Sequence, residues 1–259
     1  MLRKLKKKFE EKYNHSNLID PRIDFPKNKF VIYTRGRTGS NLLSELINCH
    51  PEIYCDLEIF NFEYCKSRVR FPLMYINSCS KRATLKNKPV YGFKVKIAQL
   101  KLEHRYKNYE YILQRLNADG WKFIYLRREN FLRHQLSNYY AAETKIFHLK
   151  KNEPLPYKKI KVDFKELYES VKFGEEIDRT EEENLNGIRH LKLVYEKDLL
   201  DNSIHQKTAD KVFDYLGLKS TTVSTEFKKI TKENLEDIIL NYDEVYRYFE
   251  NTEYIKYFK

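Results

Sequence analysis

The stretch FVIYTRGRTGSNLL, residues 30–43, decides the fold of this chain. Its first four residues are apolar, aromatic or β-branched, which favours a buried strand. A short loop with Gly36 and Gly39 follows, and apolar residues then recur at helical spacing: Leu42, Leu43, Leu46 and Ile47. The sequence therefore predicts a strand, a tight loop and the N-terminus of a helix.

Such a loop is suited to binding an oxyanion. The first N–H groups of a helix have no partners within the helix and lie at the positive end of its dipole. Gly36 and Gly39 allow the backbone to approach closely, Thr38 and Ser40 add hydroxyl groups, and Arg37 adds a permanent positive charge. The phosphate-binding motif GxxxxGK[ST] is absent, because no lysine precedes the hydroxyl residue. The loop alone fits either an anion site or an ordinary strand-to-helix turn.

Length and composition indicate a folded, basic protein. The chain has 259 residues, enough for one large core or two small ones, and one α/β domain is the simpler expectation. Hydrophobic residues make up 41% and aromatic residues 15%, which argues against disorder. The formal net charge of +12 indicates either solubility by charge or an anionic partner: nucleic acid, an acidic membrane, or a phosphate- or sulfate-bearing substrate.

The cysteines and the N-terminus narrow the class further. Cys49, Cys55, Cys65 and Cys79 show neither CxxC spacing nor a nearby histidine pattern, so we predict reduced thiols and no metal site. No apolar stretch approaches the roughly 20 residues that a membrane span needs. The basic segment 1–28 lacks the apolar core of a secretory signal and is expected either to be solvated or to contact an anionic membrane. These features predict a soluble, cytoplasmic protein.

Strand and helix patterns alternate along the chain. Strands are expected at 53–55, 89–97, 122–128 and 191–195, and helices at 104–118, 131–147, 206–216 and 232–249. The alternation predicts an α/β fold with a central, mainly parallel sheet and helices on both faces. The strongly charged residues 150–186 are expected to form an exposed excursion. Ligands should bind beyond the carboxyl ends of the strands, where the loops 34–41 and 127–130 both open.

The second of these loops is a further anion candidate. Arg127 and Arg128 end a predicted strand, and Ser137 lies on the helix that follows. An arginine and a hydroxyl can hold a phosphate through charge-assisted hydrogen bonds, although a salt bridge and a surface serine would give the same pattern. Two anion loops at one sheet edge suit a ligand with phosphates at two ends.

Five segments together resemble the sulfotransferases that use 3′-phosphoadenosine 5′-phosphosulfate, especially the bacterial carbohydrate enzymes that act on trehalose, nodulation factor or lipopolysaccharide. Residues 34–60, TRGRTGSNLLSELINCHPEIYCDLEIF, are similar to the family's 5′-phosphosulfate loop, and 123–143 to its 3′-phosphate segment. YGFKVK (91–96), LVYEKDLLDN (193–202) and KKITKENLEDIILNYDEV (228–245) are similar to its remaining elements. The resemblance implies a P-loop-like, three-layer domain over 29–259.

The resemblance also implies site residues and a reaction. It assigns Arg37 to the bridging oxygen of the donor and Glu58 to the general base. The 3′-phosphate would be held by Arg128 and Ser137. The other residues assigned to donor binding are Arg35, Gly36, Thr38, Gly39, Ser40, Asn41, Lys229 and Thr231. The reaction that the resemblance implies moves a sulfuryl group to an acceptor hydroxyl on a carbohydrate or glycolipid, releases 3′,5′-bisphosphoadenosine and needs no metal.

Several alternatives stay open at this level. Asp56 is the rival base, and Asp56, Lys94 and His148 are candidate contacts of the sulfate or the acceptor. Lys94 and Lys96 share one strand face, so either could reach the sulfate or lie at the surface. A nucleotide or small-molecule kinase would need a loop lysine that is absent here. A nucleic-acid-binding protein would explain the charge but not two strand-end anion loops, so no nucleic-acid partner is expected.

Overall fold

The computed structural model describes residues 20–147, 149, 151–154, 158–227 and 234–258. The chain forms two compact units. Unit 1 consists of Met1–Arg127 and Asn184–Ser224, and unit 2 of Arg128–Glu183 and Thr225–Lys259. That residues 29–259 form one domain stays a prediction, and most of the basic segment 1–28 lies outside the described residues.

Unit 1 is built on a five-stranded sheet with the strand order β2-β3-β1-β4-β5. The strands are β1 (Asn28–Thr34), β2 (Ile53–Glu58), β3 (Val90–Val95), β4 (Lys122–Arg127) and β5 (His190–Val194). All four neighbouring pairs are parallel, so the strands share one carboxyl edge. The central strand β1 delivers the loop 35–39 to that edge. The predicted α/β fold with a parallel sheet is confirmed.

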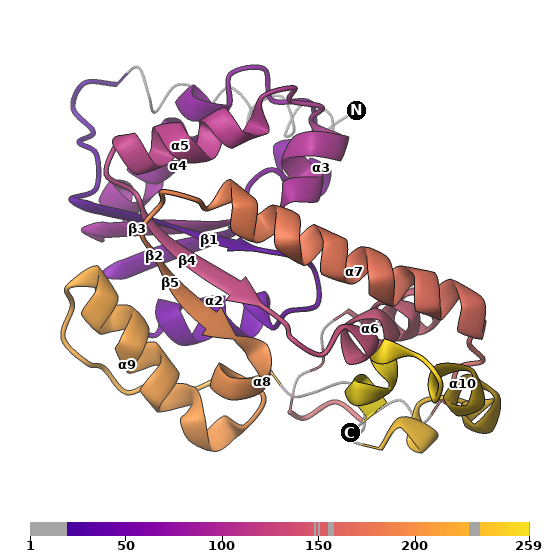
Figure 1. Cartoon of the computed structure of the whole chain (residues 1–259). Helices are drawn as coiled ribbons and strands as arrows, with labels where there is room; N and C mark the ends of the chain where they lie inside the picture. The colour runs from indigo at the N-terminus through magenta and orange to yellow at the C-terminus, as the bar shows by residue number, and fades with distance from the viewer. Residues whose placement is uncertain (1–19, 148, 150, 155–157, 228–233, 259) are drawn as a thin grey trace, which may run out of the picture. The chain divides into compact units, whose positions relative to one another are not determined.

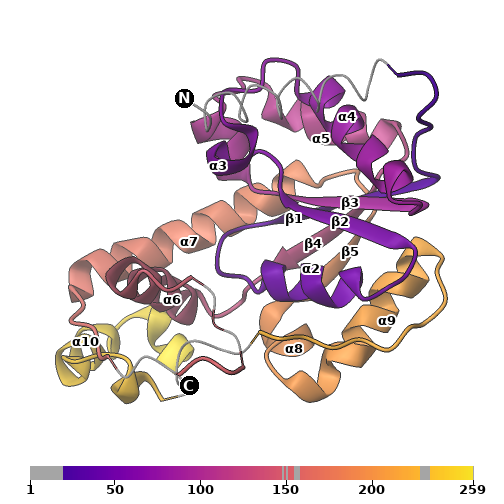
Figure 2. The ribbon, with the colours of Figure 1, turned by 180° about the vertical axis from the view of Figure 1, so that it is seen from behind.

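Side chains alternate along β1 between two cores, one on each face of the sheet. Val31 and Tyr33 belong to a core with α4 (Pro72–Leu85) and α5 (Tyr109–Ala118). Phe30 and Ile32 belong to a core with α2 (Ser40–Asn48) and α9 (His205–Leu216). The helices of these two cores lie on opposite faces of the sheet (Figures 1 and 2). Unit 1 therefore has three layers, as predicted.

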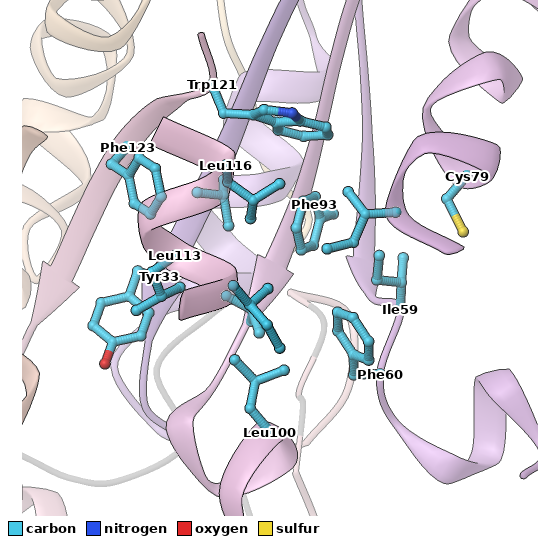
Figure 3. Packing of buried hydrophobic residues seen from close by; sticks show 14 of the residues in the cluster. Tyr33, Ile59, Phe60, Cys79, Phe93, Leu100, Leu113, Leu116, Trp121 and Phe123 are labelled. Atoms are coloured by element: carbon cyan, nitrogen blue, oxygen red, sulfur yellow. The ribbon is translucent and has the colours of Figure 1, made fainter. Parts of the chain in front are cut away.

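Aromatic packing dominates the first of these cores. In Figure 3, Phe93, Trp121 and Phe123 pack with Leu113 and Leu116 of α5. The Phe93 and Trp121 rings meet edge to face, with centroids 5.4 Å apart. Burying each such side chain stabilises the fold by about 1.5–3 kcal/mol, so this layer holds β3 and β4 firmly in place.

The pairing of β1 with β3 depends on one glycine. Phe30 and Gly92 are register partners, and the Phe30 ring lies against the Gly92 backbone. A Cβ atom at position 92 would stand 2.1 Å from Cζ of Phe30, which is too close for any side chain. Gly92 thereby lets β3 pair closely with β1, and this pairing places the end of β3 beside the loop that follows β1.

Unit 2 is mainly helical. Its elements include α6 (Phe131–Thr144), α7 (Phe164–Asn184, whose last residue belongs to unit 1), α10 (Tyr242–Phe249) and the short helices η3 (Leu235–Asp237) and η4 (Glu253–Phe258). Their core contains Leu132, Leu136, Leu167, Val171 and Phe249. In the described parts of the chain, no helix has the length and apolarity needed to cross a membrane.

Three local expectations were wrong. Residues 150–186 contain the long helix α7 rather than only an exposed excursion; its charged surface hides Leu167 and Val171, which are buried. Its start is capped by Asp163, whose carboxylate accepts hydrogen bonds from the N–H groups of Lys165 and Glu166.

The other two concern helix boundaries. The helix expected at 104–118 begins only at Tyr109, because Arg105 has a left-handed backbone, with φ 53°. A π-helix, η1 (Gln99–Glu103), precedes it. The helix expected at 232–249 is interrupted in its described part, because Ile239 forms a parallel β-bridge with Ile160 and α10 starts only at Tyr242.

Candidate functional site

The loop between β1 and α2 is held from inside by its threonines. The Thr34 hydroxyl donates to the carbonyl oxygen of Leu126 on β4 (2.7 Å) and lies 2.6 Å from the Thr38 hydroxyl. Thr38 Oγ1 also lies 3.0 Å from the carbonyl oxygen of Arg35. Both threonines are fully buried. The Thr38 hydroxyl therefore holds the loop in shape from inside.

The backbone of the loop turns twice through the left-handed region. Arg37 has φ 63° and Gly39 has φ 81°. Gly39 is the N-cap of α2, and because it has no side chain it cannot cap the first-turn amides itself. Successive turns of this kind place N–H groups around a concavity that favours anions. The predicted strand end, tight turn and helix start are present, and anion binding by this loop stays a prediction.

Tyr195 fixes the shape of this loop, a role that the sequence did not reveal. It begins α8 (Tyr195–Asp198), directly after β5. A Cβ atom at Gly39 would stand 2.7 Å from Cδ2 of Tyr195 and 3.3 Å from Cδ1 of Leu199. Gly39 is therefore needed both for its φ angle and for this close packing. Only the resemblance of 193–202 to a family element pointed to this region.

A cluster of polar side chains lies next to the loop, and we call it the Glu58 cluster. Glu58 ends β2 and is the register partner of Lys94 on β3. Glu58 Oε2 lies 2.7 Å from Lys96 Nζ and accepts a hydrogen bond from Gln99 Nε2 at 2.8 Å. Glu58 Oε1 has a longer contact, 3.8 Å, with Lys94 Nζ. Lys94 also donates to Asn41 Oδ1 in the first turn of α2.

These contacts connect the Glu58 cluster to the anion loop at two points. The first is the Lys94–Asn41 hydrogen bond. The second is Lys96, whose Nζ lies 3.8 Å from the position that a Cβ of Gly36 would take. Lys96 is partly exposed, with a side-chain exposure of 25%, whereas Lys94 is buried. The ammonium group of Lys96 therefore stands between the loop and the Glu58 carboxylate.

Burial changes the acid–base behaviour of Lys94. Desolvation lowers the pKa of Lys94 to about 8, and the nearby Glu58 carboxylate opposes this shift in part. Because Lys94 contacts both Asn41 and Glu58, its charge state acts on the start of α2 and on the end of β2 together.

Asp56, the rival candidate base, lies on the other face of the sheet. Its Oδ2 accepts a hydrogen bond from the Tyr91 hydroxyl (2.8 Å) and pairs with Nη1 of Arg82 on α4 (3.3 Å). Tyr91 belongs to the α4–α5 core, whereas Lys94 faces α2. A bulge between Cys55 and Glu58 lets the two carboxylates, two residues apart, face different layers.

The remaining predicted residues fall in three places. Arg35, Gly36 and Arg37 are half-buried in the loop, and Ser40 is buried at the start of α2. Arg128 and Ser137 are both buried in unit 2, where Ser137 lies on α6. Their assignment to a 3′-phosphate stays a prediction. His148, Lys229 and Thr231 lie outside the described residues.

Gln99 is a residue of the candidate site that no sequence pattern predicts. It is almost fully buried at the start of η1, donates to Glu58, and accepts a hydrogen bond at Oε1 from the Lys96 backbone N–H (3.2 Å). A single glutamine after a strand has no distinguishing pattern, and the π-helix that directs it is not encoded by a simple periodicity.

The candidate site combines a loop that carries two arginines with a neighbouring carboxylate. Arg35 and Arg37 belong to the loop, and Lys94 and Lys96 stand next to it, so positive charge exceeds the single negative charge of Glu58. These cations suit an anionic group at the loop. The Glu58 carboxylate, a candidate base, lies at the same edge of the sheet.

The chain was compared with protein families, curated proteins and solved structures. No family model and no curated protein matches this sequence. Among solved structures, the chain is similar to the sulfotransferase domain of the olefin synthase of Synechococcus PCC 7002. The alignment covers 82% of this chain and 84% of that chain, with 14% identity and a TM-score of 0.41. A likeness at this level carries no argument about chemistry, which depends on the residues described above.

Proposed function

We propose that this protein is a sulfotransferase that moves a sulfuryl group from 3′-phosphoadenosine 5′-phosphosulfate to an acceptor hydroxyl, with 3′,5′-bisphosphoadenosine as the product. The observation that carries the proposal is the position of Lys96, next to Gly36 of the anion loop and 2.7 Å from the Glu58 carboxylate. It joins a site for an anionic leaving group to a candidate base.

The residues present fit such a donor. The loop 35–41 combines a helix N-terminus, two left-handed turns and two arginines, a set that matches a phosphosulfate. When bound, the donor would supply the activated sulfuryl group. Arg37 and Lys96 are the cations placed to stabilise negative charge that develops at the loop. Because a guanidinium does not give up its proton near neutral pH, Arg37 acts by charge and hydrogen bonding.

Glu58 is the better candidate base on geometric grounds. Its Oε2 is engaged by Lys96 and Gln99, which fix the direction of the carboxylate. Within the described residues, Oε1 has only the 3.8 Å contact with Lys94, so it keeps capacity to accept a proton. In this role Oε1 takes the proton of the acceptor hydroxyl as that oxygen attacks sulfur. Asp56 is held by Tyr91 and Arg82 on the other face.

The acceptor class, the donor site without metal and the 3′-phosphate contacts are proposed from the resemblance of five segments to the sulfotransferase family. It favours a carbohydrate or glycolipid hydroxyl as the acceptor and a donor site without metal. It also assigns the 3′-phosphate to Arg128 and Ser137, which would make a bisphosphonucleotide the preferred ligand.

A binding experiment tests the donor assignment. Thermal shifts are recorded with 3′,5′-bisphosphoadenosine, AMP and Mg·ATP in parallel. Saturation at 100 times Kd stabilises a protein by about 2.7 kcal/mol. We expect the bisphosphate to bind more tightly than AMP or ATP, since each lost charge-assisted contact costs about 1.5–3 kcal/mol. Equal affinity for AMP would contradict the 3′-phosphate assignment, and preference for Mg·ATP would favour a kinase.

A further inference from the structure

Two neighbouring segments of unit 1 carry many exposed apolar and basic side chains. The first segment, 62–74, contains α3 (Phe62–Cys65) and the start of α4, and the second, 99–107, contains η1. Helices α3, α4 and α5 lie in the same layer (Figures 1 and 2). We call the exposed surface of these two segments the basic–apolar face.

His104 fastens the two segments together. Its Nδ1 accepts a hydrogen bond from the Val69 N–H (3.1 Å), so Nε2 carries the proton and donates to the carbonyl oxygen of Phe60 (2.7 Å). The His104 ring also packs against Phe62, with centroids 4.8 Å apart. Arg68 Nη2 donates to the carbonyl oxygen of Arg105 (3.3 Å). The face is therefore a built surface rather than two separate loops.

The apolar part of this face is unusually exposed. Leu102 is 67% exposed and Phe71 is 65% exposed, and Met74, Phe62 and Tyr64 are exposed as well. Scattered single apolar residues need no explanation, but five on two connected segments mark an interaction surface.

The charge of the face indicates the partner. The segments 62–74 and 99–107 contain six basic residues and two acidic ones, and all eight are exposed. The basic residues are Lys66, Arg68, Arg70, Lys101, Arg105 and Lys107. Apolar side chains between lysines and arginines suit the boundary of an anionic bilayer, where the apolar groups enter the lipid and the cations meet the headgroups.

We propose that the basic–apolar face docks on an anionic lipid bilayer. The second segment begins at the Glu58 cluster with Gln99, the first residue of η1, and the first segment begins four residues after Glu58. Docking thus brings the candidate base to the lipid surface and makes the acceptor a lipid-borne hydroxyl. This last step rests on the proposed function, whereas docking itself does not.

Vesicle sedimentation with the full chain tests the docking. One arm uses phosphatidylcholine alone and the other equal parts of phosphatidylcholine and phosphatidylserine. The apolar variant Phe71→Ser/Leu102→Ser has the matched control Phe173→Ser/Leu240→Ser, since Phe173 and Leu240 in unit 2 are 60% and 64% exposed. Phe71 is the N-cap of α4, a position where serine is favoured, so this variant keeps the helix start.

A charge variant tests the basic side chains of the face and leaves its exposed apolar side chains unchanged. Arg70→Gln/Lys107→Gln is compared with Lys165→Gln/Lys172→Gln, which removes two exposed lysines of α7. Binding should weaken about fivefold for each basic side chain lost from the face, and about tenfold or more for the apolar variant. Both control variants should bind as the parent does.

The outcomes separate the explanations. Binding only to the anionic vesicles, lost in both face variants, supports the proposal. Parent-like binding by the face variants overturns it and points to another basic segment, and equal binding to neutral vesicles overturns it too. A change in oligomeric state without vesicle binding makes the face a protein interface and also overturns it. Because no arm depends on turnover, failure of the proposed function leaves these readouts unaffected.

Discussion

The ammonium group of Lys96 lies 2.7 Å from the carboxylate of Glu58 and beside Gly36 of the anion loop. This arrangement makes Lys96 the residue through which the anion site and the candidate base are joined. A cation in that place can stabilise charge at the loop and orient the carboxylate at the same time.

Lys96→Ala should therefore reduce kcat/KM by about 10- to 100-fold, which corresponds to the roughly 1.5–3 kcal/mol of a hydrogen bond to a charged group. The matched control is Lys207→Ala, which removes an exposed lysine on α9. Steady-state kinetics would reveal the difference. Equal rates for the two variants would mean that Lys96 is an ordinary surface lysine without a role in the reaction.

Arg37 is predicted to act on turnover more than on product binding, since its charge matters most when the leaving oxygen becomes negative. Arg37→Ala and Arg37→Gly should both lower kcat by about 10²–10³, the usual effect of removing one such donor. Because Arg37 has φ 63°, the glycine variant relieves backbone strain and controls for the loop conformation. Arg37→Lys should recover part of the rate. Parent-like turnover of the alanine variant would make the arginine structural.

The two carboxylates should separate chemistry from stability. Glu58→Gln should keep the fold and donor affinity but lower kcat by about 10²–10⁴, the contribution of general base catalysis. Asp56→Asn should instead lower the free energy of unfolding by about 3 kcal/mol, because it removes the charge that faces the Arg82 guanidinium, whose Nε and Nη2 atoms are buried. Denaturant unfolding and kinetics on both variants check this, and a slower Asp56 variant than Glu58 variant would reverse the assignment.

Lys94 should give stability a recognisable pH dependence. Burial lowers its pKa from 10.5 to about 8, so between these values the unfolded chain binds more protons than the folded chain. The contribution of Lys94 to the free energy of unfolding therefore rises with pH in that window, by about 1.4 kcal/mol per pH unit. Between pH 7.5 and 9.5, the parent should gain about 2 kcal/mol relative to Lys94→Met. Parallel stability curves for the two proteins would show that Lys94 keeps an ordinary pKa.

Much of unit 1 was predictable because its signals are local. The buried run Phe30–Tyr33 and the glycines of the loop specify a central strand and a turn, and the structure confirms both. The parallel sheet follows from the alternation of strand and helix patterns, and the return of Glu58 toward the loop followed from the short strand before it.

What escaped prediction depends on contacts between distant residues. Gln99 acquires its role only because a π-helix turns it toward Glu58, and Tyr195 only because it packs on Gly39. The left-handed backbone at Arg105 delays α5, and the bridge of Ile239 to Ile160 interrupts the helical pattern before α10. Such tertiary contacts override local periodicity.

The most direct test of the central claim is turnover of the donor. The parent and Glu58→Gln are each supplied with ³⁵S-labelled 3′-phosphoadenosine 5′-phosphosulfate and a panel of sugars and glycolipids, and release of 3′,5′-bisphosphoadenosine is followed with the transfer of label. The account predicts release coupled one-to-one to a labelled acceptor in the parent and a rate about 10²–10⁴ lower in Glu58→Gln. No release above background with any acceptor, from a chain that the bisphosphate does not stabilise, would contradict it.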